Sequence, residues 1–436
     1  MAQKPGDIFI LSFRADGIVR SYRISEREGK AETDEFADLR NIIFMDTANK
    51  KDTDLLSYMK RFNFNEDNGD GELVIGFGAA AKNLMMIAVH NTNLGPALGG
   101  LREKAYHNFD SMLTDALRLS RAMTYKAAMA DTKTGGGKAA RLIPAREARS
   151  AANKEFARVI NFINEERKKR SVNPYVTAED SNTCCQDFDE IGSLSDEVTC
   201  KSINAGGSGN PSPITAIGVY HAAKAGAEFA FAGKTLGGKV VLISGIGQCG
   251  YELAKNYLAG GVGKVICAEL SEERIEWVKR QFGKMGEIDR IEFLFYTKEQ
   301  LKNQEFLADL ANKVDIFSPC ALGRSIDSSN ISVFKNSRLR LICGSENNQL
   351  ADEEKHGSIL HEMGIVYVPD YVANAGGLIN CAKEIHGRMF LISETIKEAM
   401  NIENTVRRVL SLSKEKNIPA YLAANQMAQE RFMRRA

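Results

Sequence analysis

The chain has 436 residues, of which 44% are hydrophobic and 26% charged, and its formal net charge at pH 7 is +1. This length predicts two domains, and the balanced charge argues against nucleic acid or a membrane surface as a partner. No apolar run reaches the ~18 residues that cross a bilayer. The eight cysteines lack CxxC spacing and the six histidines form no HxH or HxxxH pair. This pattern argues against a metal site and favours reduced thiols, so we expect a cytoplasmic protein.

The first 52 residues are predicted to form a small module of their own. Two strand-like runs, residues 8–13 and 18–24, flank Asp16-Gly17, a favoured hairpin turn. A short charged helix is expected to follow the hairpin. The module carries no residues with evident chemistry.

Residues 53–208 are predicted to form an α/β domain with a mostly parallel sheet. Apolar alternation and helical periodicity place strands at 73–77, 84–89 and 175–180, and helices at 111–127 and 151–169.

A run of three glycines followed by Lys138 stands out in this domain. The glycines leave the backbone open to close approach by a small molecule, and Lys126 lies twelve residues before Lys138. A second lysine nearby would lower the pKa of Lys138. By itself the stretch is more typical of a flexible surface turn. The last strand of the domain ends in Glu179 and Asp180, and a parallel strand points such a residue at the edge where α/β sheets place their sites.

A linker of glycine, serine and proline is expected at 206–212, and a Rossmann-type doubly wound domain at 209–389. Its strands alternate with helices, and three of them run into polar or glycine-containing loops, at 318–323, 344–348 and 370–377. Since these loops follow successive strands of one fold, they are expected to contact a cofactor. Two long helices are expected at 393–415 and 419–434, and this C-terminal segment, about 390–436, is expected to belong to the first domain.

The strongest motif of the second domain is a complete GxGxxG formed by Gly245, Gly247 and Gly250. It follows a strand, opens a helix, and precedes a second strand that ends at Glu269, 19 residues past the last glycine. This order indicates a dinucleotide site, with the pyrophosphate at the helix N-terminus and Glu269 on the ribose hydroxyls. A carboxylate there repels a 2′-phosphate, so we expect NAD rather than NADP.

A nicotinamide-type domain implies hydride transfer, and the substrate is then expected in a cleft between the two domains. Two lysines and one carboxylate in the first domain suit an α-amino acid. One cation would bind its carboxylate, the other would stabilise a developing oxyanion, and the acid would serve the amine.

On these motifs the chain resembles the glutamate/leucine/phenylalanine/valine dehydrogenase family, and the leucine dehydrogenases most. The resemblance runs over residues 53–436. Its matching stretches are LGPALGG (94–100), MTYK (123–126), GGGK (135–138), TAED (177–180), SGNPSP (208–213) and PDYVANAGG (369–377).

The resemblance implies a role for each of these groups. Lys126 binds the substrate carboxylate, assisted by Asn374 and the backbone around Gly95. Lys138 is the catalytic lysine that polarises the keto oxygen and activates the water attacking the imine, and Asp180 shuttles a proton on the amino nitrogen. A homo-oligomer is implied, with an amino acid, its 2-oxo acid and ammonia as small-molecule partners. Cofactor contacts are implied at Asn210, Thr215, Cys320, Ala321 and Asn348.

The same resemblance locates the pocket for the substrate side chain. Its walls are apolar or thiol groups, which suit L-leucine and, by overlap, isoleucine and valine. Phenylalanine, valine or tryptophan as the preferred substrate, and an inactive relative that senses NAD or amino acids, are the alternatives. The chain departs from the family in Lys133 beside the glycines and in Cys184-Cys185 after Asp180. The pocket positions are Leu94, Ala178, Leu378 and Cys381.

Overall fold

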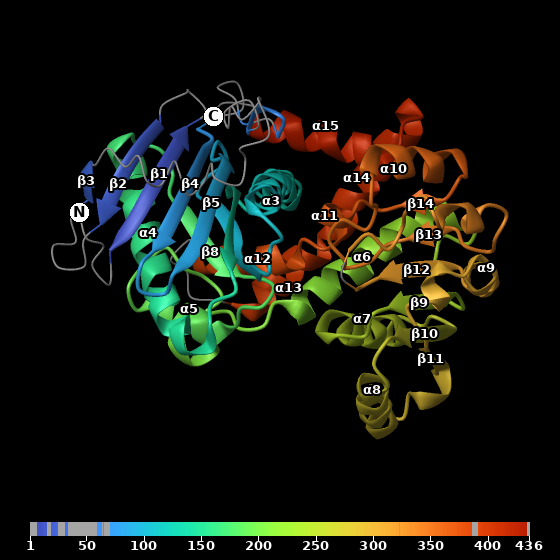
Figure 1. Cartoon of the computed structure of the whole chain (residues 1–436). Helices are drawn as coiled ribbons and strands as arrows, with labels where there is room; N and C mark the ends of the chain where they lie inside the picture. Colours follow the sequence, from blue (N-terminus) through green and yellow to red (C-terminus); the bar gives the residue numbers. More distant parts are fainter. Residues whose placement is uncertain are drawn as a thin grey trace. The chain divides into compact units, whose positions relative to one another are not determined.

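The computed structural model describes residues 7–14, 19–24, 31–33, 59–62, 64, 70–321, 323–385 and 391–433. The chain divides into two compact units. Unit 1 comprises residues 1–210, 381–390 and 429–436, and unit 2 comprises residues 211–380 and 391–428. Each unit is built on one sheet covered by helices, which confirms the expected two-domain α/β fold (Figure 1).

The domain boundaries differ from the expectation at both ends of the chain. The sequence assigned residues 390–436 to the first domain, but residues 391–428 belong to unit 2. The amino-terminal hairpin is present as β1 (Ile8–Arg14) and β2 (Val19–Ile24), and β1 also pairs with β4 (Glu72–Gly78). These strands therefore extend the sheet of unit 1. The expected charged helix lies mostly outside the described residues.

Unit 1 holds an eight-stranded sheet with the order β3-β2-β1-β4-β5-β7-β6-β8. Among the described strands of this sheet, β6 pairs in parallel with β7 and with β8, and the other pairs are antiparallel. The sheet is therefore mixed rather than mostly parallel, and its parallel part is confined to these three strands. The remaining strands are β3 (Ala31–Thr33), β5 (Asn83–Asn91), β6 (Ala97–Lys104), β7 (Gly135–Leu142) and β8 (Tyr175–Glu179).

Helices cover both faces of this sheet. On one face lies α3 (Phe109–Ala130), which begins at a capping box between Asn108 and Ser111 and packs its buried apolar side chains on β4 and β5. On the other face lie α4 (Arg149–Lys169) and α5 (Cys185–Gly192). The two faces have separate apolar cores, because successive side chains of a strand point to opposite sides.

Unit 2 holds a six-stranded sheet with the order β11-β10-β9-β12-β13-β14, parallel throughout. This is the strand order of the doubly wound dinucleotide fold, as expected. The strands are β9 (Val240–Ser244), β10 (Lys264–Glu269), β11 (Ile291–Phe295), β12 (Ile316–Pro319), β13 (Leu341–Ile342) and β14 (Val366–Tyr367).

The helices of the second half of the chain follow the expected alternation with one exception. The single helix expected at 393–415 is two helices, α13 (Ile392–Met400) and α14 (Ile402–Lys416), which meet at Asn401. In the described part of the chain, no helix is both long and apolar enough to cross a bilayer. The others are α6 (Ser212–Ala230), α7 (Gln248–Ala259), α8 (Glu272–Met285), α9 (Gln304–Lys313), α10 (Glu353–Glu362), α11 (Asp370–Ala373), α12 (Gly376–Ile385) and α15 (Ala420–Phe432).

Candidate active site

The three glycines before Lys138 begin the buried strand β7 and are not a surface turn. None of the three has a positive φ. A Cβ on Gly136 would lie 2.1 Å from the backbone nitrogen of Thr124 on α3, and one on Gly137 would lie 2.7 Å from the Tyr175 ring. The glycines therefore allow the strand to pack closely against its neighbours. They do not adopt the unusual backbone dihedrals that the sequence suggested.

The register of β7, β6 and β8 brings Lys138 and Asp180 to one face of the sheet. Arg102 of β6 pairs with Ala140 of β7, which lies two residues after Lys138 and on the same face of the strand. The side chains of Arg102 and Lys138 therefore both point toward α3. Gly100 of β6 is opposite Ala178 of β8, which places Asp180 just past the end of β8 beside Arg102.

Gly100 leaves the space in which the two side chains meet. Lys138 is on β7 and Asp180 follows β8, so both reach across β6, which lies between those strands. A Cβ on Gly100 would lie 2.8 Å from the Cβ of Asp180 and 2.8 Å from the carbonyl oxygen of Glu179. Any side chain at this position would push β8 away.

The resulting cluster alternates positive and negative charge. Lys138 Nζ lies 2.5 Å from Asp180 Oδ2, and Arg102 Nε donates to the same oxygen at 3.0 Å. Arg102 Nη1 lies 3.4 Å from Asp115 Oδ2, which also accepts a hydrogen bond from the Tyr106 hydroxyl at 2.9 Å. The sequence predicted Lys138 and Asp180, but it did not mark Arg102, Asp115 or Tyr106. For Arg102 the only signal was its place in the charged run that ends β6, directly after Leu101.

Burial and charge act on the two central groups in different ways. Lys138 is only 6% exposed, and burial lowers its pKa. Asp180 opposes this lowering of the lysine pKa, and the Arg102 charge adds to it. Burial alone would raise the pKa of Asp180, but Lys138 and Arg102 together hold it well below its usual range. The carboxylate is shared between two cations, so the lysine is the group prepared to lose its proton.

The expected lowering of the Lys138 pKa is therefore present, but the sequence attributed it to Lys126, whereas the cation that adds to burial is Arg102. Lys133 lies in the turn before β7 with its side chain 69% exposed, and it pairs with Asp131 at 2.7 Å. An exposed pair of this kind is screened by water. Lys133 is thus not the extra cation expected beside Lys138.

Lys126 and Gly95 lie in the same unit as this cluster. Lys126 is half-buried on α3, eleven residues after Asp115. Eleven residues are close to three helical turns, so the two side chains leave the same face of the helix. Gly95 has a φ of +141°, and a Cβ there would lie 2.2 Å from the carbonyl oxygen of Lys133. Only glycine fits this position.

The expected pocket residues are divided between the two units. Ala178 and Cys381 are buried residues of unit 1, and Leu94 is half-buried in the loop before β6. The Cys381 sulfur lies 2.8 Å from that of Cys200, and both are free thiols. Cys200 is a neighbour of the pocket position that the sequence did not identify. Leu378 is a buried residue of unit 2.

Asn374 belongs to unit 2, and within the described residues only the nitrogen of its side-chain amide is hydrogen-bonded. Its Nδ2 donates to the Ser345 carbonyl at 3.1 Å and to Asn347 Oδ1 at 2.9 Å. Its Oδ1 is buried and has no hydrogen-bond partner among the described residues. A buried acceptor left unpaired is costly, so this oxygen is suited to a donor group on a ligand.

The GxGxxG motif occupies the turn from β9 into α7, as the sequence predicts. Gly245 has a φ of +91°, and a Cβ on Gly250 would lie 2.1 Å from the Gly245 carbonyl oxygen. A Cβ on Gly247, the N-cap of α7, would meet nothing within 4 Å, and no described side chain caps this helix. The helix N-terminus is therefore open to an anion such as a pyrophosphate.

Glu269 stands at the end of β10 beside this turn. Its Oε2 accepts a hydrogen bond from the Ile246 backbone N–H at 3.1 Å, so the carboxylate is aimed at the motif. A Cβ on Gly245 would lie 3.0 Å from the backbone of Cys320 and of Ala321, which places the loop after β12 next to the same turn. A cavity of about 770 Å³ at these strand ends is lined by Ser244, Ala268, Leu270 and Ala321, among others. These features fit a dinucleotide.

The other expected cofactor positions lie in separate segments. Thr215 is in the first turn of α6 and donates to the Pro211 carbonyl, and Asn348 lies in the loop after β13 with a φ of +55°. Asn210 is an exposed residue at the end of the unit 1 segment. Within the described residues, no group of His, Cys, Asp or Glu could hold a metal ion.

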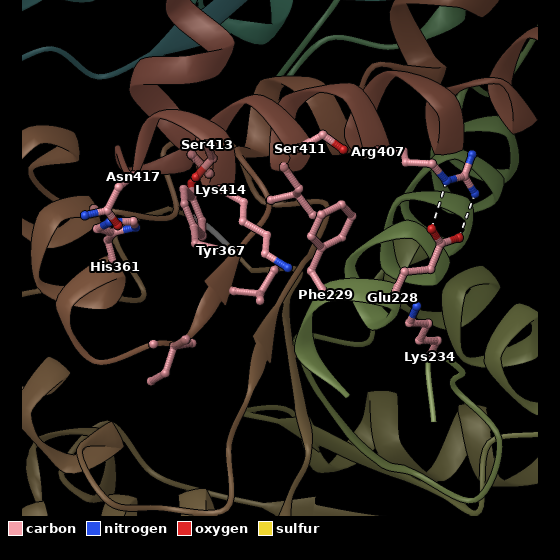
Figure 2. Close-up of a pocket in the computed structure, with 16 residues that line it drawn as sticks. Glu228, Phe229, Lys234, His361, Tyr367, Arg407, Ser411, Ser413, Lys414 and Asn417 are labelled. Atoms are coloured by element: carbon pink, nitrogen blue, oxygen red, sulfur yellow. Dashed lines mark hydrogen bonds and ion pairs between the residues drawn. The ribbon is translucent and has the colours of Figure 1, made fainter. Parts of the chain in front are cut away.

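A second cavity of unit 2, of about 810 Å³, is not lined by the GxGxxG turn (Figure 2). It is lined by residues 364–366 at the start of β14 and by Arg407 and Lys414 of α14. Because the strands are parallel, the start of β14 lies at the opposite end of the sheet from Gly245. Arg407 is held there by two hydrogen bonds to Glu228, of 2.6 and 2.8 Å.

Comparison with known families matches almost all of the chain after residue 57. Residues 58–196 match the Glu/Leu/Phe/Val dehydrogenase dimerisation domain, and residues 206–436 match the glutamate/leucine/phenylalanine/valine dehydrogenase domain. The chain belongs to this family. It is therefore an amino acid dehydrogenase. The resemblance seen in the sequence rested on the lysine, aspartate and glycine motifs described above.

Individual relatives narrow the comparison. The leucine dehydrogenase of Bacillus subtilis (strain 168) is 36% identical over 382 residues, which are 87% of this chain and 94% of that protein. The leucine dehydrogenase of Geobacillus stearothermophilus is 40% identical over 354 residues, 80% of this chain and 88% of that protein. Among solved structures, the L-tryptophan dehydrogenase of Nostoc punctiforme matches with a TM-score of 0.64 at 30% identity, over 84% of this chain and 96% of that one.

Proposed function

We propose that the chain catalyses the reversible, NAD-dependent oxidative deamination of a branched-chain L-amino acid, with L-leucine preferred over isoleucine and valine. The reaction converts the amino acid, NAD⁺ and water into the 2-oxo acid, ammonium, NADH and a proton. The observation that carries this proposal is the ion pair of Lys138 with Asp180, within a chain whose relatives at 36% and 40% identity are leucine dehydrogenases.

The residues of unit 1 have distinct tasks in this reaction. Lys126 binds the substrate carboxylate, assisted by the backbone at Gly95. Lys138 in its neutral form takes a proton from the water that adds to the imine carbon, and a lowered pKa makes this form more abundant near the working pH. Asp180, ionised between two cations, carries the proton on and off the substrate nitrogen. In the reverse direction the protonated Lys138 polarises the keto oxygen.

The residues of unit 2 hold the cofactor and complete the substrate contacts. The nicotinamide ring of NAD would supply the hydride acceptor. The open N-terminus of α7 after Gly245 and Gly247 would hold its pyrophosphate, and Glu269 would hold its ribose hydroxyls. The unpaired Oδ1 of Asn374 is suited to accept a hydrogen bond from the substrate amine, in addition to its expected part in binding the carboxylate.

Substrate preference rests on the small buried groups at the pocket positions. Ala178 and Cys381 are small and buried, which suits a branched aliphatic chain, and the Cys200 sulfur lies 2.8 Å from that of Cys381. One methylene in such a pocket changes binding by only ~1–3 kcal/mol, so leucine, isoleucine and valine overlap. The match to a dimerisation domain supports assembly as a homo-oligomer.

A screen of amino acids decides between the candidate substrates. NADH formation is followed by absorbance with leucine, isoleucine, valine, phenylalanine, tryptophan and glutamate at alkaline pH, which favours deamination. We expect the highest kcat/KM with leucine, isoleucine or valine and little activity with glutamate. If kcat/KM is highest with phenylalanine or tryptophan, that amino acid is the preferred substrate, and the proposed preference for leucine is wrong. Binding of NAD without turnover of any amino acid would support a sensing role instead.

A further inference from the structure

Arg102 contacts both carboxylates of the cluster in unit 1, and its charge acts on the proposed catalytic lysine. We propose that Arg102 is a positioning residue: it holds Asp180 in place, shares its carboxylate with Lys138, and thereby sets the pH at which Lys138 becomes a base. The inference rests on the proposed function, because it assigns Arg102 a task within that reaction.

The geometry gives Arg102 two anchors. Its Nε donates to Asp180 Oδ2 at 3.0 Å, the same oxygen that lies 2.5 Å from Lys138 Nζ. Its Nη1 reaches Asp115 Oδ2 at 3.4 Å. The planar guanidinium is thus fixed between a carboxylate after β8 and one on α3, and this orientation fixes the direction of the Asp180 carboxylate.

The charged surroundings of Lys138 can be named element by element. β6 contributes Arg102, the segment after β8 contributes Asp180, and α3 contributes Asp115, with Lys126 on the same helix face. β5 contributes His90, which bonds to Thr124 at 2.8 Å and whose pKa burial lowers to about 3, so it is neutral. Glu179 leaves β8 on the opposite face of the sheet. The charged groups on this face are therefore two anions, Asp180 and Asp115, and two cations, Arg102 beside the pair and Lys126 on α3.

The sign of each effect follows from this arrangement. A carboxylate beside an ammonium raises the pKa of the ammonium, and a second cation lowers it. Without Arg102, Asp180 would interact with Lys138 alone, and the pKa of Lys138 would rise. Without the charge of Asp115, the positive charge of Arg102 would be less compensated, and the pKa of Lys138 would fall.

The experiment measures the acid limb of kcat for leucine deamination in the full-length enzyme. Arg102→Gln is expected to move this limb to higher pH by about one unit. Asp115→Asn is expected to move it to lower pH by a smaller amount. Arg102→Lys keeps the positive charge but loses the planar guanidinium that bonds both carboxylates. The acid limb of its kcat–pH profile should therefore stay near the wild-type position, while kcat falls. Opposite shifts from two neighbouring substitutions are not produced by loosened packing.

Arg118→Gln is the matched control. Arg118 pairs with the other oxygen of Asp115 at 3.5 Å, its side chain is 38% exposed, and it is not a partner of Asp180. Its removal should leave the limb in place. A second readout is the pH dependence of Lys138 acylation by acetic anhydride, followed by mass spectrometry, which needs no turnover and should show the same ordering.

The outcomes separate this inference from the proposed function. If the wild-type enzyme turns over leucine but Arg102→Gln lowers kcat without moving either the limb or the acylation profile, Arg102 is only structural and the inference is wrong. If no amino acid is turned over, the proposed function fails, and the acylation profiles still decide whether Arg102 controls the proton affinity of Lys138.

Discussion

Two lysines five residues apart show how placement decides chemistry at the residue scale. Lys133 is 69% exposed and pairs with Asp131 in the turn before β7, while Lys138 is 6% exposed and lies against Asp180. A buried ammonium loses the solvation that keeps its proton bound, and an exposed one does not. Both carry the same formal charge in the sequence, but only Lys138 is prepared to act as a base.

Replacement of Lys138 by alanine removes the proposed base and should reduce kcat for leucine deamination by roughly 10²–10⁴-fold. NAD binding, followed by fluorescence of the reduced cofactor, should stay near wild type, because the dinucleotide residues lie in unit 2. Lys133→Ala is the matched control and should keep at least half of the wild-type kcat. Near-normal turnover by Lys138→Ala would remove Lys138 from the mechanism.

The pH profile of the wild-type enzyme should show the lowered pKa of Lys138. Because the neutral amine is the active form in deamination, kcat should rise with pH and level off at a pH below 10.5, the ordinary lysine value. In the reverse amination the protonated form is active, so that rate should fall over the same range. Steady-state rates in both directions from pH 7 to 11 test this; limbs of the same sign in both directions would contradict it.

At the scale of elements, the Lys138–Asp180 pair depends on the position of β6 between β7 and β8. Lys138 comes from β7 and Asp180 follows β8, and Gly100 on β6 lets them meet. The parallel pairing of these three strands, in an otherwise antiparallel sheet, brings their polar residues to one place. Gly136 of β7 lets α3, the helix of Asp115 and Lys126, approach this strand closely.

Gly100→Ala tests this dependence on a bare backbone. The added methyl group would lie 2.8 Å from the Asp180 Cβ, so β8 must move and the Lys138–Asp180 contact must lengthen. We expect a loss of kcat of at least tenfold and a lower Tm. Gly283→Ala on α8 is the control, since a Cβ there meets nothing within 4 Å and alanine favours the helix by about 0.5–1 kcal/mol. A Gly100→Ala enzyme with wild-type kcat would show that the contact is dispensable.

The β9–α7–β10 element carries a prediction about the cofactor. Glu269→Ala removes the carboxylate that Ile246 orients, and with it the hydrogen bonds to the ribose hydroxyls and the repulsion of a 2′-phosphate. Since such a bond is worth about 1.5–3 kcal/mol, the preference for NAD over NADP should fall by roughly 10–100-fold. The ratio of kcat/KM for the two cofactors measures this. Glu273→Ala, an exposed position on α8, should leave the ratio unchanged.

At the scale of the whole molecule, the amino-terminal strands are part of the main sheet of unit 1. β1 lies between β2 and β4, and its side chains enter both cores: Ile8 and Ile10 pack toward α4, and Phe9 and Leu11 pack toward α3. The strands therefore continue the sheet that carries the site, with β1 four positions away from β6 in the strand order. Their contribution is to the stability of unit 1.

Ile10→Ala measures that contribution. Ile10 is fully buried, and truncation of such a side chain costs about 2–5 kcal/mol of unfolding free energy, through lost transfer energy and the cavity left behind. Urea unfolding of the variant should show this loss, while the KM for leucine stays within about twofold. Ile143→Ala is the control, because Ile143 is half exposed and surface changes stay within about 0.5 kcal/mol. An unchanged unfolding midpoint for Ile10→Ala would show that β1 is peripheral.

Local pattern predicted many of the elements and the motif residues, but it missed the strands β6 and β7. Periodicity located the ends of α3 and α4 to within three residues, and the order of strand, GxGxxG, helix and terminal acid identified the dinucleotide fold, because each of these signals depends only on neighbours along the chain. The family resemblance added Lys126, Lys138 and Asp180 as one set. It did so without showing which side chains touch.

Tertiary structure decided what no local pattern contains. Strand order and register, which depend on contacts between distant segments, made the first sheet mixed and put Gly100 and Arg102 between Lys138 and Asp180. Burial then separated Lys138 from Lys133, and pairing of β1 with β4 made the amino-terminal hairpin part of unit 1. The sequence by itself determined which residues are present for the chemistry. Their distances, and so the pH at which they act, follow from packing, since charge interactions depend on separation and solvent exposure.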